Sequence, residues 1–255
     1  MRADWLVPEW KAGGVGALMT TRHGGVSEPP FDTMNLRLEV GDETLAVARN
    51  RALLAQTIGA VPVFLNQVHG ATVVRLTRSD TAADAPLREA DASITTEPGI
   101  ACTVQVADCL PVLFAAPEGR GVAAAHAGWR GLALGVLEAS VRQLCVAASC
   151  EPRDLRAWLG ACIGPDRFEV GADVLSAFGV APEASDPLRF RPHAAGKWLA
   201  NLPLLARDRL HAVGVQRISG GTWCTVEDRS RFFSFRRDGI TGRTAAAVWI
   251  DRNAG

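Results

Sequence analysis

The sequence predicts an α+β fold, a single domain built on a mixed β-sheet. Short apolar runs of strand length, some of them β-branched, cover residues 72–76, 100–106, 111–115, 121–125, 157–159 and 245–250. Several runs follow one another with no helical segment between them, whereas a doubly wound parallel sheet places a helix after each strand. A chain of 255 residues without internal repeats or long linkers fits one domain over residues 1–255.

Four segments have the apolar spacing of helices, and they cover residues 43–58, 130–147, 169–178 and 199–212. In the first segment, the predicted buried face consists of Leu45, Ala48, Ala52, Ala55 and Ile58. Asp42 is placed to cap the start of this helix. In the second segment, the apolar positions are Leu134, Leu137, Val141 and Leu144. Two stretches rich in proline, alanine and charge, 79–88 and 182–192, are predicted to be surface loops.

The charge of the chain is balanced, with 27 basic and 27 acidic side chains. This balance argues against nucleic-acid binding, which needs a basic surface that displaces counterions. No apolar run approaches the roughly 18 residues of a membrane-spanning helix. The first ten residues include two acidic side chains and lack the apolar core of a signal peptide. We therefore expect a cytoplasmic protein with no membrane contact.

The six cysteines, at positions 102, 109, 145, 150, 162 and 224, form no CxxC pair and no dense pattern. This usage indicates reduced thiols and not a disulfide framework. Tyrosine is absent, which excludes tyrosine as an acid, a base or a nucleophile. The signatures of phosphate-binding loops, dinucleotide folds, zincins and serine hydrolases are also missing from the sequence.

Three segments place metal-binding side chains at the edges of predicted strands: residues 66–70 with His69, 107–111 with Cys109, and 126–131 with His126. If the runs 111–115 and 121–125 are neighbouring strands, Cys109 and His126 lie at adjacent strand ends, and His69 can reach them from its loop. Two imidazoles and a thiolate suit Zn²⁺, and three protein ligands leave the open position of a catalytic site. Two alternatives stay open: each side chain is simply packed beside its strand, or Cys109 is a nucleophile paired with His126.

Residues 128–131 are predicted to open a helix, and their two glycines would let the backbone approach a ligand closely. Backbone N–H groups at such a position favour an anion, and Arg130 could grip phosphate or carboxylate. The alternative is a tight strand-to-helix turn with Arg130 in solvent. Arg22, in the polar loop 20–27, is a second candidate anion contact or part of an ordinary surface turn.

The motifs NQVHG, ADCLP and HAGWRG, in this order, closely resemble the YfiH-like family, historically described as polyphenol oxidase or laccase-domain proteins. Further segments agree, namely TTRHGGVS (20–27), GACIGP (160–165), FEVG (168–171), FFSFRRDG (232–239) and TGR (241–243). The resemblance runs from about residue 15 to about residue 250. Two departures are visible, because Phe168 and Phe235 stand where this family often has tyrosine.

The resemblance implies a single domain with α/β/α layers, similar in its core to a bacterial toxin deamidase of the CNF type. It also implies that His69, Cys109 and His126 are the metal-binding and catalytic residues. The expected substrate-binding residues are Arg22, Gln67 and Arg130. The metal expected is Zn²⁺, with Cu²⁺ as a possible occupant, and the expected partners are a purine nucleoside and phosphate, with no protein partner evident.

The activities that the resemblance implies are phosphorolysis of adenosine, inosine and 5′-methylthioadenosine, together with adenosine deamination. Zinc could activate water for attack on adenine C6, and Asp108 is the nearest acid in sequence, although strand alternation would turn it away from Cys109. Trp129 or Phe233 could supply an aromatic wall. The alternatives are a Cys–His amidase that edits peptidoglycan precursors and a copper-dependent laccase. Five histidines without an HxH pair argue against the laccase, because a blue-copper centre alone takes two of them.

Overall fold

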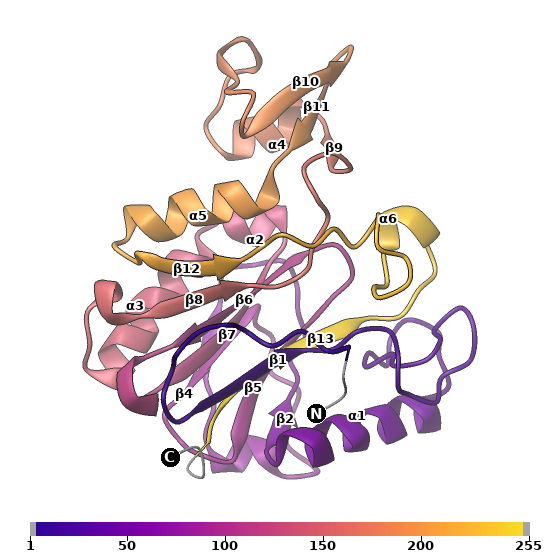
Figure 1. The fold of residues 1–255 in the computed structure, drawn as a ribbon, viewed down its shortest axis with the longest axis vertical. Coiled ribbons are helices and arrows are strands. Elements are labelled where there is room, and N and C mark those ends of the chain that lie inside the picture. Colours follow the sequence, from indigo (N-terminus) through magenta and orange to yellow (C-terminus); the bar gives the residue numbers. More distant parts are fainter. Residues whose placement is uncertain (1–3, 252–255) are drawn as a thin grey trace.

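The computed structural model describes residues 4–251, which form three β-sheets flanked by helices (Figure 1). The four-stranded sheet has the order β1 (Val15–Met19), β13 (Thr244–Ile250), β5 (Ile100–Val106) and β2 (Val61–Val63). The six-stranded sheet has the order β12 (Arg217–Gly220), β8 (Arg156–Leu159), β6 (Leu110–Ala115), β7 (Val122–Ala127), β4 (Ala92–Thr95) and β3 (Val73–Arg75). Both sheets combine parallel and antiparallel pairs. The predicted α+β class with a mixed sheet is confirmed.

The two larger sheets pack face to face. Met19, Val104 and Val248 of the four-stranded sheet share one buried cluster with Leu113 and Trp158 of the six-stranded sheet. Every residue of β5 and of β6 is buried, because their strands have packed neighbours on both faces. This burial explains why the sequence shows continuous apolar runs here and not an alternation of apolar and polar residues.

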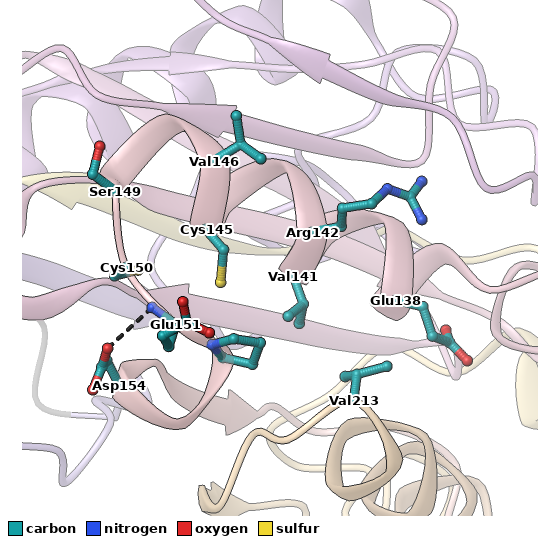
Figure 2. A pocket seen from close by; sticks show the side chains of 11 residues that line it. Glu138, Val141, Arg142, Cys145, Val146, Ser149, Cys150, Glu151, Asp154 and Val213 are labelled. Atoms are coloured by element: carbon teal, nitrogen blue, oxygen red, sulfur yellow. Dashed lines mark hydrogen bonds between the residues drawn. The ribbon is translucent and has the colours of Figure 1, made fainter.

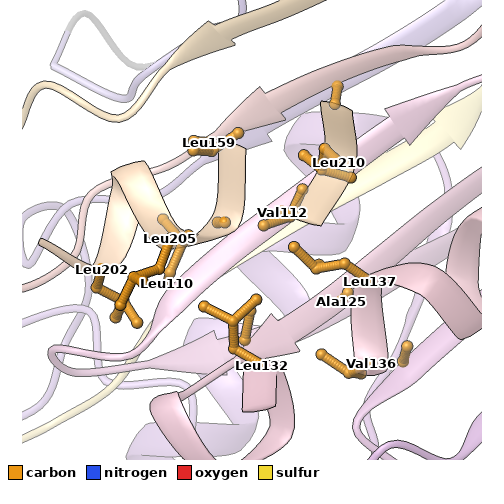
Figure 3. Packing of buried hydrophobic residues seen from close by; sticks show 14 of the residues in the cluster. Leu110, Val112, Ala125, Leu132, Val136, Leu137, Leu159, Leu202, Leu205 and Leu210 are labelled. Carbon is orange, nitrogen blue, oxygen red and sulfur yellow. The ribbon is translucent and has the colours of Figure 1, made fainter. Parts of the chain in front are cut away.

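Helices cover the outer face of each sheet. Below the four-stranded sheet, α1 (Thr44–Ile58) contributes Leu54 and Ile58 to a cluster with Leu18 and Ala247. The other sheet is covered by α2 (Trp129–Ala133), α3 (Val136–Ala148) and α5 (Leu202–Ala212), whose leucines pack on Val112 (Figure 3). The expected helical layers therefore enclose the β-structure, which consists of two packed sheets.

A small three-stranded sheet projects from one end of the molecule, at the top of Figure 1. It is formed by β10 (Phe190–Ala194), β11 (Lys197–Ala200) and β9 (Glu169–Val170), with α4 (Ala172–Ala177) beside it. Two predictions are corrected here. The helix expected at 169–178 begins as a strand, and the loop expected at 182–192 ends in β10. The predicted helix at 199–212 starts at Leu202, because the side chain of Asn201 accepts a hydrogen bond from the backbone N–H of Leu204.

Of the buried face predicted for α1, only Ile58 is confirmed, and the other four positions are wrong. Leu45 is 63% exposed, and the buried positions are Ala46, Val47, Asn50, Leu54 and Ile58. The helix is turned about its axis relative to the prediction because Asn50 must face inward. Its side-chain amide donates hydrogen bonds to three oxygens of the loop 27–35. Asp42 does not cap the helix; one of its oxygens accepts hydrogen bonds from Ser27 and Asn35 instead.

The helix predicted over 130–147 is two helices, α2 and α3. Gly135, at φ 91°, adopts the left-handed backbone conformation that favours glycine and breaks the run. Leu134, expected on the apolar face, is consequently 67% exposed. The remaining helix, α6, covers Phe235–Asp238. No helix within residues 4–251 has the length and apolarity required to cross a membrane.

Candidate metal centre and the cavities beside it

Two of the three candidate ligands are brought together by one strand pair. β6 and β7 are antiparallel, with Pro111 opposite His126 and Leu110 opposite Ala127. Cys109 immediately precedes β6, so its side chain emerges beside His126, which lies near the end of β7. The predicted proximity of these two residues at adjacent strand ends is confirmed.

His69 completes the cluster from the loop between β2 and β3, where it has a positive φ of 61°. One donor atom from each of His69, Cys109 and His126 lies within 4.8 Å of the others. His69 Nε2 is 3.8 Å from Cys109 Sγ. Tetrahedral coordination of zinc would separate these two atoms by about 3.6 Å, given bonds of roughly 2.3 and 2.0 Å. The donor types and their spacing therefore fit a zinc ion.

Asp91, a residue that the sequence analysis did not identify, holds two of the three candidate ligands in place. Its carboxylate is fully buried just before β4 and accepts a hydrogen bond of 2.8 Å from His126 Nδ1. It also accepts backbone N–H bonds from Val68 (3.2 Å), His69 (2.9 Å) and Gly70 (2.6 Å). One side chain thus fixes both the His126 ring and the loop that carries His69.

The bond to Asp91 also sets the tautomer of His126. With Nδ1–H donating to a carboxylate, the lone pair of the neutral ring is on Nε2, the atom available to a metal. Nothing in the sequence pairs Asp91 with a histidine 35 positions later. The only signal is an acidic residue at the start of a buried apolar run.

The metal-free cluster stabilises a thiolate beside an imidazolium. Burial disfavours ionisation of Cys109, but the neighbouring His126 and His69 outweigh it and lower the pKa of the thiol to about 6. Burial likewise disfavours the charged form of His126, yet Cys109 and Asp91 raise the pKa of its ring to about 9. Asp91 has a lowered pKa despite its burial, because His126 and backbone N–H groups stabilise the carboxylate.

Two cavities meet at the cluster, and both are lined by His69, Ala107, Cys109 and Phe235. The smaller, about 190 Å³, has aromatic and aliphatic walls contributed by Trp129, Phe168, Ile163 and Leu202, with Arg130 and Arg236 also present. The larger, about 350 Å³, is polar, and its walls include Arg37, Glu39, Gln67, Gln105 and Arg243. The two cavities therefore adjoin at His69 and Cys109; aromatic and aliphatic side chains dominate the walls of the smaller one, and each cavity contains two arginines.

Arg22 does not join this site. It lines a separate surface depression with His23 and Asp32, and its guanidinium is held by Asp32 (3.1 Å) and by backbone oxygens of Asp32 and Arg229. Its position does not support the predicted contact with the substrate. Gln67 does line the larger cavity, but its amide makes two hydrogen bonds with the backbone of Gln105, of 2.9 and 2.8 Å.

Arg130 lies at the smaller cavity with its guanidinium 4.3 Å from the centre of the Trp129 ring. The neighbouring glycines are explained by close packing. A Cβ on Gly131 would lie 2.7 Å from the carbonyl oxygen of Gly70, and one on Gly128 would lie 3.0 Å from Cys109 Sγ. These glycines let the segment 128–131 pack closely against Cys109 and the loop of His69. Close packing explains them without an anion, so they do not support the predicted anion wall at 128–131.

Asp108 also departs from expectation, because it lines the smaller cavity and does not point away from it. Its φ of 87° and its place in the turn between β5 and β6 remove the alternation of a regular strand. Its two oxygens accept bonds of 2.6 Å from Thr225 Oγ1 and from the backbone N–H of Arg236, so the carboxylate is fixed. Phe233 is fully buried core, and Trp129 is the predicted aromatic residue that reaches the cavity.

A third and larger cavity, about 740 Å³, lies elsewhere, along α3 (Figure 2). It contains Cys145 and Cys150 but none of the three candidate ligands. Burial and the nearby Cys150 raise the pKa of Cys145 to about 12, and burial also raises the pKa of Cys150. Thiols in this state are poor nucleophiles and poor metal ligands, so the smaller cavities beside Cys109 are the chemically competent ones.

Alkylation should separate these thiols in metal-free protein. Iodoacetamide at pH 7.5 should modify Cys109 at least about tenfold faster than Cys145, because the thiolate is the reactive species and its larger fraction at Cys109 outweighs its lower basicity. The rate at Cys109 should fall as the pH drops through about 6. Peptide mass spectrometry over time measures both sites, with Cys109→Ser as the control. Equal rates at the two positions would contradict the thiolate–imidazolium pair.

Gly128→Ala should impair metal binding without unfolding the protein. The added Cβ would lie 3.0 Å from Cys109 Sγ and 3.1 Å from His69 Cδ2, which forces two ligands apart. The backbone of Gly128, at φ −61° and ψ 158°, is accessible to alanine. We expect at least about a tenfold loss of zinc affinity. Gly13→Ala, with no atom within 4 Å of the added Cβ, is the matched control, and equal zinc affinity in both variants would refute the packing role.

Comparison with known proteins gives consistent relatives. Residues 16–251 match a family described as multi-copper polyphenol oxidoreductase laccase. A Pseudomonas aeruginosa protein named purine nucleoside phosphorylase PA4543 is 48% identical over 248 residues, covering 96% of this chain and 98% of the relative. The protein named purine nucleoside phosphorylase YfiH from Escherichia coli K12 is 47% identical with the same coverage.

Solved structures of similar proteins have the same fold. NMB0706 of Neisseria meningitidis superposes with a TM-score of 0.89 at 44% identity, covering 97% of this chain and 99% of that protein. YlmD of Geobacillus stearothermophilus superposes with a TM-score of 0.87 at 32% identity, covering 97% of this chain and all (100%) of that protein.

Proposed function

This chain belongs to the YfiH-like family described as multi-copper polyphenol oxidoreductase laccase, and on that premise we propose that it is a zinc-dependent purine nucleoside phosphorylase. The observation that carries the proposal is that a cavity with aromatic walls and a more polar cavity with two arginines adjoin at His69 and Cys109 of the candidate metal centre. A phosphorylase must hold a flat, largely apolar purine and an anion on opposite sides of one sugar carbon. Relatives named as purine nucleoside phosphorylases support the same assignment.

If His69, Cys109 and His126 held a zinc ion, three protein ligands would leave one position for water or substrate, as in catalytic zinc sites. When bound, zinc supplies Lewis-acid chemistry and the capacity to activate water. Asp91 holds His126 in the ligating tautomer, and Cys109 contributes the thiolate. These contacts support a zinc centre held by this chain's own side chains.

The purine has a suitable place in the smaller cavity. Trp129, Phe168 and Phe235 offer aromatic rings there, and Ile163 and Leu202 add aliphatic surface. Flat heterocycles gain stacking and burial energy on such walls. We propose adenosine, inosine and 5′-methylthioadenosine as substrates, since an apolar cavity tolerates changes at the purine 6-position and at the sugar 5′-position. Adenosine deamination is a further proposed activity of the same centre.

A second candidate is a Cys–His amidase acting on a peptidoglycan precursor. The observation that favours it is the low pKa of Cys109, about 6, beside a protonated His126, the ionic pair of cysteine nucleophiles. A thiolate bound to zinc is a poor nucleophile, so metal content separates the two functions. A multicopper oxidase has less support, because within residues 4–251 His69, Cys109 and His126 form the one cluster placed to hold a metal.

The test combines metal analysis with product analysis. Protein purified without added metal should contain about one zinc per chain, and with phosphate it should convert adenosine to adenine and ribose 1-phosphate. Without phosphate, adenine should not form, and inosine formation would report the deaminase. Copper found after isolation would not identify the working metal, since such ligands bind copper more tightly than zinc.

The rate of phosphorolysis should depend on the bound zinc. A strong chelator should abolish phosphorolysis, and added zinc should restore it. If metal-free protein carries out phosphorolysis at the full rate in strong chelator, the zinc dependence is wrong. If the protein shows no phosphorolysis with or without zinc, and the metal-free form hydrolyses a peptidoglycan precursor until one equivalent of iodoacetamide inactivates it, the phosphorylase proposal is wrong and the amidase takes its place.

A further inference from the structure

We propose that Arg37 and Arg243 form the binding site for the inorganic phosphate cosubstrate, in the larger of the two cavities beside the metal cluster. This inference rests on the proposed phosphorylase function and assigns its anion site. It replaces Arg22 and Arg130, the arginines that the sequence favoured for this role.

Both arginines line the cavity that His69, Cys109 and His126 also line. In the described part of the chain, Arg243 donates only through Nη1, to the carbonyl oxygens of Thr241 (2.8 Å) and Gly242 (3.1 Å). Its Nε and Nη2 donate no hydrogen bond to residues 4–251, nor do the terminal nitrogens of Arg37. Unused N–H groups on two arginines are the donors that a tetrahedral oxyanion accepts.

The two arginines are 206 positions apart in sequence, and a buried asparagine holds them together. Asn35 is fully buried, and its Oδ1 accepts the backbone N–H of Arg37 (3.1 Å) and that of Arg243 (2.9 Å). Its amide nitrogen donates to the carbonyl oxygen of Arg37 (2.9 Å). Gly242 lets the chain approach, because a Cβ there would lie 2.9 Å from Asn35 Cβ. The backbones of the two arginines are therefore held side by side before any anion binds.

The local charge is unbalanced in favour of an anion. The one carboxylate in the cavity wall is Glu39, which is 61% exposed and 3.4 Å from Arg37 Nε. An exposed ion pair of this kind is weak and yields readily to a multivalent anion. Burial and repulsion from Arg37 lower the pKa of Arg243, so a bound dianion would relieve the cost of confining two cations.

The chemistry of the step places phosphate opposite the purine. A phosphate oxygen forms a bond to the sugar C1′, the C1′–N9 bond breaks, and its electron pair leaves with the purine. The proton of monohydrogen phosphate ends on the purine, so the products are the free base and ribose 1-phosphate. With the base in the aromatic cavity, Arg37 and Arg243 line the adjoining cavity, which shares His69 and Cys109 with it, and this is where the proposal places the attacking phosphate.

Zinc-loaded protein carrying Arg37→Gln or Arg243→Lys tests the site. Losing a charge-assisted contact should raise the KM for phosphate about 10- to 100-fold in each variant. The KM for adenosine and the zinc content should stay within about twofold of wild type. Arg153→Gln, an exposed arginine remote from both cavities, is the matched control. Arg37 lies in a surface loop, so its variant should fold even if the Arg243 variant does not.

Direct binding of inorganic phosphate, measured by calorimetry without nucleoside, keeps this inference separable from the proposed function. Phosphate that binds wild type but not Arg37→Gln supports the site even if no phosphorolysis is detected, in which case only the proposed function fails. An unchanged phosphate affinity and KM in Arg37→Gln overturns the site, whatever the activity. If only Arg130→Ala raises the KM for phosphate, phosphate binds in the smaller cavity, and the proposed site at Arg37 and Arg243 is wrong.

Discussion

Replacing Cys109 with alanine should remove the bound metal and reduce phosphorolysis to background. Cys109 is the only anionic donor among the three ligands, and it lies within 4.8 Å of the donor atoms of His69 and His126. Zinc binding free energies of about 10 kcal/mol or more are shared among the ligands of a site. Losing one of three protein ligands should therefore weaken zinc binding by at least about 100-fold. The fold should persist, because the truncated side chain lies at the edge of a cavity.

The measurement is zinc content together with the rate of adenine formation, in wild type and variant purified side by side. Cys150→Ala is the matched control, because Cys150 has a similar partial burial but lies in the cavity along α3. Zinc content and rate should be unchanged in that control. A Cys109→Ala protein that keeps one zinc and normal phosphorolysis would show that Cys109 is not a ligand and would refute the metal centre as described.

Local sequence signals were sufficient to predict the centre of the site. The apolar runs 111–115 and 121–125 have strand length and are close in sequence, which favours neighbouring strands, and on that condition they predicted Cys109 beside His126. The continuous apolar character of β5 and β6 likewise reflects burial on both faces. Where one strand pair determines the geometry, the sequence contains the necessary information.

The residues that sequence reasoning missed are held by contacts between distant segments. Asp91 reaches back to the loop of His69 and forward to His126, and Asn35 links Arg37 to Arg243 across most of the chain. No periodicity reports such polar contacts. A polar contact between distant segments also explains why the predicted buried face of α1 was mostly wrong. Hydrogen bonds from Asn50 to the loop 27–35, and not apolar spacing, determine which face of the helix is buried.

Asp91→Asn should weaken zinc binding by about 10- to 100-fold and lower the free energy of unfolding by about 3 kcal/mol. The carboxylate accepts four N–H bonds, whereas an amide offers one acceptor oxygen and turns its own N–H₂ toward other donors. Both His126 and the loop of His69 should consequently lose their fixed positions. The dependence on pH supplies an independent readout of the same carboxylate.

The native pKa of Asp91 is lowered, so its charge stabilises the folded state above the unfolded pKa of about 3.9, and this part is lost as the pH falls through the native pKa. Metal-free wild type should therefore lose stability in acid more steeply than Asp91→Asn. Denaturant unfolding from pH 7 to 3 measures this difference, and zinc competition titrations at pH 7 measure affinity. Asp80→Asn is the matched control, because Asp80 also accepts backbone and arginine bonds but lies outside the site. If Asp91→Asn binds zinc as tightly as Asp80→Asn does, the carboxylate supports the fold alone, and its positioning of His126 and His69 is refuted.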